Sequence, residues 1–163
     1  MIRMIRLSLL ATALLASAAI PPARAAAPPS DLCSLLSAGE ISKALGNAYD
    51  APKKSIAPRP FPGTNEGTDC HYPAKSGGGE LWLRAYVDPS PAAATELFAK
   101  LRFFYSPPKP VAGLADEAYY DPRHGLHVRK GNVRYFLQLD TSNFTAANEK
   151  QLNDLAAMVA GKL

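Results

Sequence analysis

The sequence predicts an α+β domain: an antiparallel β-sheet with helices packed against one face, closed by one disulfide. Three observations predict it. Several segments alternate apolar and polar residues with a period of two, as half-buried strands do. Other segments space apolar residues three and four positions apart, behind residues that favour a helix start. The chain of 163 residues also contains 2 cysteines, Cys33 and Cys70, which are enough for one disulfide.

The clearest element is a β-hairpin with strands over residues 126–129 and 133–139. A two-residue turn with positive φ at Gly131 and Asn132 would set its register. That register places apolar pairs on one face and polar pairs on the other, and a slip of one residue would destroy the agreement. The expected partners are Arg129 with Arg134, Val128 with Tyr135, His127 with Phe136, and Leu126 with Leu137.

Three helices are expected. Ser37 and Glu40 match a capping box for the first helix, and Ser90 followed by Pro91 is a favoured start for the second. The third begins within residues 143–145. The expected buried stripes are Ile41, Ala44 and Leu45; Leu97, Leu101 and Phe104; and Leu152, Leu155, Val159 and Leu163.

Further strands are expected over residues 68–72, 80–87 and 118–121, and a short one is compatible with residues 48–55. The prolines and glycines between residues 52 and 67 predict a surface loop.

The N-terminal residues predict export. Arg3 and Arg6 precede an apolar run over residues 7–20, which small residues follow, as in a secretory signal peptide. A retained membrane helix is the alternative, which the short run and the prolines Pro21 and Pro22 disfavour. Contact with a membrane is thus expected only through the transient signal, and the location is periplasmic or secreted.

Cleavage after Ala25 and cleavage after Ala27 both fit the small-x-small rule. We adopt the first, so residues 1–25 are the signal and residues 26–163 form one domain. The signal removes three of the 18 lysines and arginines, while all 14 acidic residues remain, so the mature net charge is about +1. This near balance argues against nucleic acid as a partner.

In an exported protein, the two cysteines predict a disulfide between Cys33 and Cys70. Closing a loop of about 37 residues should stabilise the fold by roughly 3–4 kcal/mol through loop-closure entropy. The alternative is a lipid on Cys33, which residues 30–32 disfavour because they are not the small residues of a lipoprotein signal.

Several segments resemble a family of small bacterial secreted proteins and lipoproteins of unknown function. Residues 33–46 match its Cys-x-Leu-Leu-(Ser/Thr)-x-x-Glu opening, and residues 111–119 match its Gly-Leu-(Gly/Ala)-Asp-Glu-Ala segment, with Ala115 where Gly is more usual. The strand at residues 126–131 and the Cys70 region are similar too. The resemblance implies an envelope location, the same disulfide and an α+β fold distantly similar to the extrinsic photosystem II subunit. It implies no reaction.

The polar face of the sheet is the candidate binding surface. Arg129 opposite Arg134 is an unfavourable like-charge pair unless an anionic ligand, a carboxylate from Asp116 or Glu117, or solvent neutralises it. Aromatic rings beside guanidinium groups suit a carboxylate, a phosphate or a glycan. The default alternative is an open face with cationic side chains lying over aromatic rings. The candidate ligand-binding residues are Trp82, Arg84, Tyr86, His127, Arg129 and Arg134.

No catalytic residue, metal ligand set or cofactor motif is predicted. His124 and His127 near Asp121 match no specific zinc spacing, and Cys70 and His71 point to opposite faces of a strand. Adjacent carboxylates at residues 116–117 should tie a loop into the sheet rather than act as an acid/base pair.

We therefore expect a non-catalytic accessory or binding module whose partner is an anionic small molecule, a glycan or an envelope protein. The alternatives are a small envelope hydrolase or transferase using the face of Arg84, His127 and Arg134, and a purely structural envelope protein. An enclosed cleft where these three residues converge would favour a binding or catalytic site over partner docking.

Overall fold

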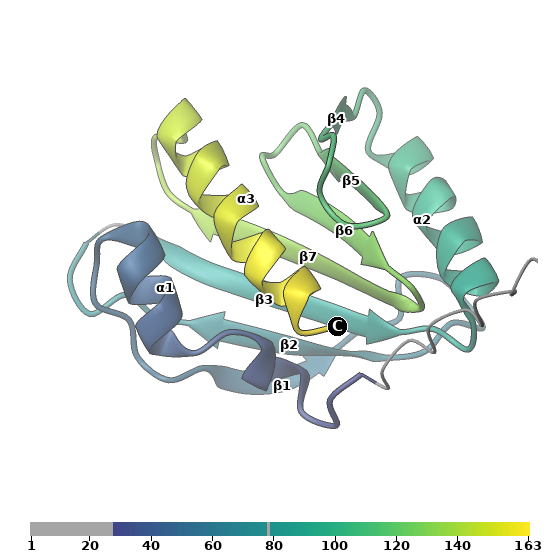
Figure 1. Cartoon of the computed structure of the whole chain (residues 1–163), viewed down its shortest axis with the longest axis horizontal. Helices are drawn as coiled ribbons and strands as arrows, with labels where there is room; N and C mark the ends of the chain where they lie inside the picture. Colours follow the sequence, from purple (N-terminus) through teal and green to yellow (C-terminus); the bar gives the residue numbers. More distant parts are fainter. Residues whose placement is uncertain (1–27, 78) are drawn as a thin grey trace, which may run out of the picture.

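The computed structural model describes residues 28–77 and 79–163, so the expected signal segment lies outside the described residues. Within these ranges, seven strands form one antiparallel sheet in the order β1-β2-β3-β7-β6-β5-β4 (Figure 1). The α+β class and the antiparallel sheet are confirmed. The strands are β1 (Lys53–Ala57), β2 (Gly67–Tyr72), β3 (Glu80–Val87), β4 (Lys109–Pro110), β5 (Glu117–Tyr120), β6 (Leu126–Lys130) and β7 (Val133–Asp140). The helices are the 3₁₀ helix η1 (Leu32–Leu35) and the α-helices α1 (Ala38–Leu45), α2 (Pro91–Phe104) and α3 (Ala146–Gly161).

The predicted hairpin is β6 and β7, and its register is confirmed at all four expected pairs. Of the two turn residues, only Gly131 has a positive φ, +57°. A single positive φ at the first central position is typical of a type II′ turn, which twists the strands in the same sense as two positive values would. The expectation of a positive φ at Asn132 is wrong. The register is nevertheless the expected one, because both turn types give the strands the same twist.

The central ladder divides the sheet into two chemically different faces. Every residue of β3 pairs with a residue of β7, from Glu80 with Asp140 to Val87 with Val133. Because successive side chains point to opposite faces, one face is apolar and the other mixed. The core face carries Leu81, Leu83, Ala85, Leu126, Val128, Tyr135, Leu137 and Leu139, all buried. The polar face carries Trp82, Arg84, Tyr86, His127, Arg134 and Phe136.

Helices α1 and α3 cover the core face, lying across the strands in Figure 1. The buried stripe of α3 includes Leu152, Leu155 and Val159, as expected. Sheet tyrosines anchor this helix, because Tyr135 Oη donates to the carbonyl of Ala156 at 2.7 Å. None of the described helices is long and apolar enough to cross a membrane.

The ends of α1 and α3 are joined by Glu40. Its carboxylate completes the predicted capping box with Ser37 and also accepts a hydrogen bond from Lys162 Nζ at 2.7 Å. The hydrogen bond from Lys162, followed by those from Ser37, lowers the pKa of Glu40 to about 2. The acidic side chain therefore stays charged where the two helices meet.

Helix α2 lies against the opposite, polar face of the sheet. The expectation that the helices pack on one face therefore holds for α1 and α3, and α2 is the exception. In Figure 1, α3 and α2 flank the β5–β6 part of the sheet. The expected stripe of Leu97, Leu101 and Phe104 is wrong: Ala94 and Phe98 are the buried residues of α2, and Phe104 is 70% exposed. The physical reason is that Phe98 packs edge-on against Tyr119 of the polar face, with ring centroids 5.1 Å apart.

Both edge strands are poorly marked in the sequence. β1 begins at Lys53, inside the range 48–55 that was considered, and extends two residues beyond it; four of its five residues are exposed. β4 has two residues and was not expected. An edge strand pairs on one side only and is often short or charged, so hydrophobic alternation does not reveal it.

Ala115 adopts a left-handed conformation, with φ +54°. Glycine occupies this region without a steric cost, whereas alanine does not. The Gly that is more usual in the resembled motif would suit the same turn.

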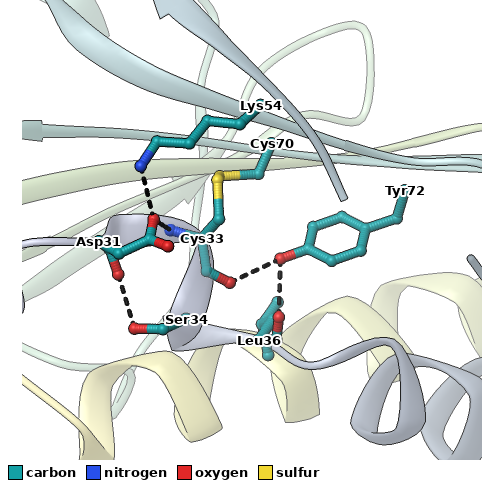
Figure 2. Close-up of a disulfide and its surroundings, with 7 residues drawn as sticks. All are labelled: Asp31, Cys33, Ser34, Leu36, Lys54, Cys70 and Tyr72. Atoms are coloured by element: carbon teal, nitrogen blue, oxygen red, sulfur yellow. Dashed lines mark hydrogen bonds and ion pairs between the residues drawn. A yellow bond between two sulfur atoms is a disulfide. The ribbon is translucent and has the colours of Figure 1, made fainter. Parts of the chain in front are cut away.

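The expected disulfide between Cys33 and Cys70 is present and joins η1 to β2 (Figure 2). Tyr72, two residues after Cys70, shares its one hydroxyl proton between the carbonyl oxygens of Cys33 at 3.0 Å and Leu36 at 2.7 Å. Cys33 Sγ is thus bonded to Cys70 and not available for a lipid. One covalent bond and one buried hydroxyl hold the N-terminal turn on the sheet.

Removing either restraint should lower stability measurably. Replacing both Cys33 and Cys70 with alanine should reduce the free energy of unfolding by about 3–4 kcal/mol, because the unfolded chain regains loop entropy. Tyr72→Phe should cost about 1–3 kcal/mol, because two buried carbonyls lose their donor. The measurement is urea denaturation followed by circular dichroism.

The control is Tyr105→Phe, since the hydroxyl of Tyr105 forms no hydrogen bond within the described part of the chain. It should change stability by less than about 0.5 kcal/mol. A loss below 1 kcal/mol in the alanine double variant would contradict the stabilising role of the disulfide.

Candidate ligand-binding site

A cavity of about 590 Å³ opens on the polar face. Its floor is formed by β3, β6 and β7, and its walls by the C-terminal half of α2 and the proline-rich loop after β1. The lining residues are Pro58, Arg59, Pro60 and Phe61 from the loop; Phe98, Leu101, Phe104 and Tyr105 from α2 and its C-cap; and Arg84, Tyr86, His127, Arg134, Tyr135 and Phe136 from the sheet. Arg84, His127 and Arg134 thus meet in one cavity, the arrangement that favours a binding or catalytic site.

Two glycines allow the aromatic floor to lie close to the backbone. A Cβ added at Gly67 would approach the ring of Tyr86 to 2.7 Å, and one at Gly125 would approach the ring of Phe136 to 2.2 Å. Such approaches are too close for any side chain. The absence of a side chain at the two glycines therefore leaves room for these rings.

The loop wall is attached to the floor and to α2. Tyr86 Oη donates to the carbonyl oxygen of Pro58 at 3.0 Å, which ties the loop to β3. At the other side, the rings of Phe61 and Phe104 pack with centroids 5.4 Å apart. These contacts place an apolar lip over the cavity.

Arg134 is the most deeply buried charged group of the floor, with 2% of its surface exposed. Its Nε and Nη2 both donate to the carboxylate of Asp88, with Nη2 2.9 Å from Oδ1. The guanidinium also lies over the ring of Tyr86, 5.1 Å from the centroid. Its third nitrogen, Nη1, is buried and has no hydrogen-bond acceptor in the described residues.

Arg84 joins this cavity to a neighbouring one of about 320 Å³. Its Nη2 donates to Asp69 Oδ2 at 2.7 Å, whereas its buried Nε has no acceptor in the described residues. Trp82 lines the smaller cavity and stacks on His71, with centroids 4.1 Å apart. Arg84 is therefore held at the boundary of two hollows.

His127 is enclosed by aromatic rings and paired with an acid. Its ring stacks on Tyr119, with centroids 4.7 Å apart, and its Nε2 lies 3.1 Å from Asp121 Oδ2. Burial of Asp121 favours its neutral form, but hydrogen bonds from His127 and from the N–H groups of Gly125 and Arg123 outweigh this and lower the pKa of Asp121. The pair fixes the orientation of the imidazole at the cavity wall.

Arg129 does not line this cavity. Its Nη1 donates to Asp116 Oδ2 at 3.0 Å and its Nη2 to Glu117 Oε1 at 2.9 Å. Asp116 also accepts a hydrogen bond from Gly131 N at 2.7 Å. Of the neutralising groups considered for Arg129, the carboxylates are thus the ones found, and they tie the loop to the hairpin as expected.

The other candidate groups lie apart. His124 stacks on Phe144, with centroids 4.5 Å apart, whereas His127 faces Asp121. Over residues 28–77 and 79–163, no group of three or more His, Cys, Asp or Glu side chains is placed to hold a metal ion.

Sequence reasoning did not identify several residues of the site: Phe61, Phe104 and Tyr105 in the walls, and Asp88 beneath Arg134. Asp88 and Arg134 are 46 residues apart, and no local pattern links them. One signal was available, because Asp88 directly follows a strand whose neighbour carries Arg134.

Comparisons with known proteins add no relative: no family model, no curated protein and no solved structure matches the chain. The resemblance to small bacterial secreted proteins therefore stays a prediction. What the site can do must be argued from its own geometry.

Arg134 is neutralised by Asp88, which is none of the groups considered for the Arg129–Arg134 pair. Arg134→Glu would therefore bury two carboxylates together. We expect a loss of about 3–5 kcal/mol, or failure to fold. Replacing the pair together, with Arg134→Met and Asp88→Leu, should cost much less because no buried charge is left alone.

The matched control is Arg123→Glu, because Arg123 is exposed and forms no ion pair in the described residues. Thermal unfolding of the four proteins measures the differences. An Arg134→Glu variant as stable as the wild type would show that the buried pair is not formed.

Proposed function

We propose that this protein is an exported, non-catalytic binding module that holds a small molecule in the cavity beneath α2. The observation that carries the proposal is the convergence of Arg84, His127 and Arg134 in a hollow of about 590 Å³. Small-molecule sites are concave, mostly apolar and oriented by a few polar groups, and they span roughly 300–1,000 Å³. The cavity has each of these properties.

Its lining favours a small molecule over the other partner classes. Aromatic, leucine and proline side chains predominate, whereas a glycan would need many hydrogen-bonding groups. An envelope protein that docks by its surface would need a flat patch, whereas this site is a hollow under a helix. A ligand with substantial apolar surface fits this lining best.

Export is part of the proposal. The tripartite N-terminal pattern supports it, and so does the disulfide between Cys33 and Cys70, because disulfides persist mainly in oxidising compartments. The two together support a periplasmic or secreted location.

A small envelope hydrolase is the second candidate, and the His127–Asp121 pair is the observation that favours it. An orienting acid behind a histidine is the arrangement of a general base. In the described residues, however, no hydroxyl or thiol is hydrogen-bonded to His127, so the pair lacks a nucleophile to activate. We therefore prefer binding without catalysis.

N-terminal processing of the chain tests the proposed export. When the full chain is expressed in a bacterium with a periplasm, we expect the periplasmic protein to begin at Ala26 and to contain no free thiol. N-terminal sequencing and thiol titration under denaturing conditions measure these two properties. Retention in the cytoplasm with residues 1–25 intact would refute export.

The fluorescence of a bound probe tests the proposed ligand binding in the cavity. The neutral apolar probe N-phenyl-1-naphthylamine should brighten on binding the wild-type protein. Phe104→Asp should weaken probe binding at least tenfold, about 1.4 kcal/mol, because Phe104 forms the apolar lip. Phe103→Asp is the matched control, since Phe103 is 80% exposed and does not line the cavity.

If the two substitutions weaken probe binding equally, or if the wild type does not enhance the fluorescence of the probe, the result would argue against a ligand in this cavity. The same protein is also incubated with a p-nitrophenyl ester. Hydrolysis that is lost in His127→Gln would favour the enzyme instead.

A further inference from the structure

Resting on the proposed binding function, we propose that the ligand is an amphipathic anion: an apolar body with one carboxylate-type head group. The head group would lie on the cavity floor at Arg134 and Arg84. The body would lie against the aromatic lip of Phe61 and Phe104. The charges, the unpartnered donors and the distribution of apolar side chains each support this class of ligand.

The charges that face the cavity have one sign. Its lining contains Arg59, Arg84 and Arg134, but no aspartate or glutamate. The carboxylates that pair with the floor arginines lie outside this lining: Asp88 contacts Arg134, and Asp69 faces the neighbouring cavity. An entering ligand therefore meets guanidinium groups without meeting the acids that balance them, and an anion is the complementary partner.

Two nitrogens of the floor arginines have no acceptor in the described residues: Arg134 Nη1 and Arg84 Nε, both buried. Asp88 already uses both carboxylate oxygens on Arg134, whereas Asp69 Oδ1, on the carboxylate that pairs with Arg84, is itself buried without a donor. A buried N–H of a charged group without a partner is costly, and a ligand oxygen removes that cost. A carboxylate has two oxygens and enough lone pairs to accept from both arginines.

The rest of the cavity is unsuited to a small, fully hydrated anion. Phe61 and Phe104 form the lip, Leu101 the helix wall, and Phe136 and Tyr86 flank the arginines on the floor. Inorganic phosphate would leave these side chains facing water, so it would forgo most of the favourable burial. A wholly neutral hydrocarbon would bury them but leave both donors without acceptors.

The test compares ligands that differ only in the head group. Decanoate, decan-1-ol and decylammonium are each titrated against protein carrying bound N-phenyl-1-naphthylamine. Decanoate should displace the probe at a concentration at least tenfold lower than decan-1-ol, and decylammonium should be the weakest. Isothermal calorimetry with decanoate gives the affinity directly.

A pair of variants locates the preference. Arg84→Gln should bring the ratio between the displacing concentrations of decanol and decanoate close to one. Probe binding should persist, because the substitution removes the head-group contact and the ion pair with Asp69 but leaves the apolar lip in place. Arg102→Gln removes the same charge from an exposed residue outside the cavity lining and should leave the ratio unchanged. Because the comparison of ligands uses the wild type, it does not depend on the folding of either variant.

The outcomes separate the two proposals. Probe binding with equal displacement by decanoate and decanol overturns the anionic head group and leaves the binding module standing. The head-group site is also overturned if the preference for decanoate is lost in Arg102→Gln but kept in Arg84→Gln. Absence of both probe binding and a calorimetric signal with decanoate refutes the proposed function itself.

Discussion

The pairing of β3 with β7 is the constraint on which the rest of the structure depends. It aligns Arg84 with Phe136, and the β6 ladder then aligns Phe136 with His127. A shift of one residue would exchange the two faces, placing the arginines in the core and the leucines in the cavity. Because the core face is packed under α1 and α3, such a shift is energetically forbidden. The buried face thereby fixes the position of every side chain on the opposite face.

Buried ion pairs are weak evidence for stability, because desolvation offsets most of their attraction. The pair of Arg134 and Asp88 therefore invites a different explanation. Asp88 binds two nitrogens of the guanidinium and leaves the third, Nη1, without an acceptor in the described residues. The carboxylate orients the guanidinium inside the protein without using all of its donors, as the proposed binding site requires.

The parts predicted correctly are those determined by local patterns. Alternation located the hairpin and β3, Ser37 and Glu40 located a helix start, and the cysteine count gave the disulfide. The side on which α2 packs was missed, because its Leu97 and Leu101 are as apolar as Ala94 and Phe98 and the helix has no dominant stripe. The cavity walls were missed for a related reason: a proline-rich loop has no periodicity that would indicate which face it covers.

Asp88 contacts Arg134 on the cavity floor and lies in the segment from which α2 begins. It lies between the end of β3 and Ser90, the N-cap of α2, and its backbone N–H donates to the carbonyl of Asn132 at 2.8 Å. Asn132 Nδ2 donates in return to the carbonyl of Asp88 at 3.0 Å, so the hairpin turn holds the point from which α2 departs. The residue that orients Arg134 on the floor is therefore also the residue that positions the helix above it. The ion pair of Asp88 and Arg134 thus links the cavity floor to the start of α2, and the C-terminal end of the same helix supplies Phe104 to the lip.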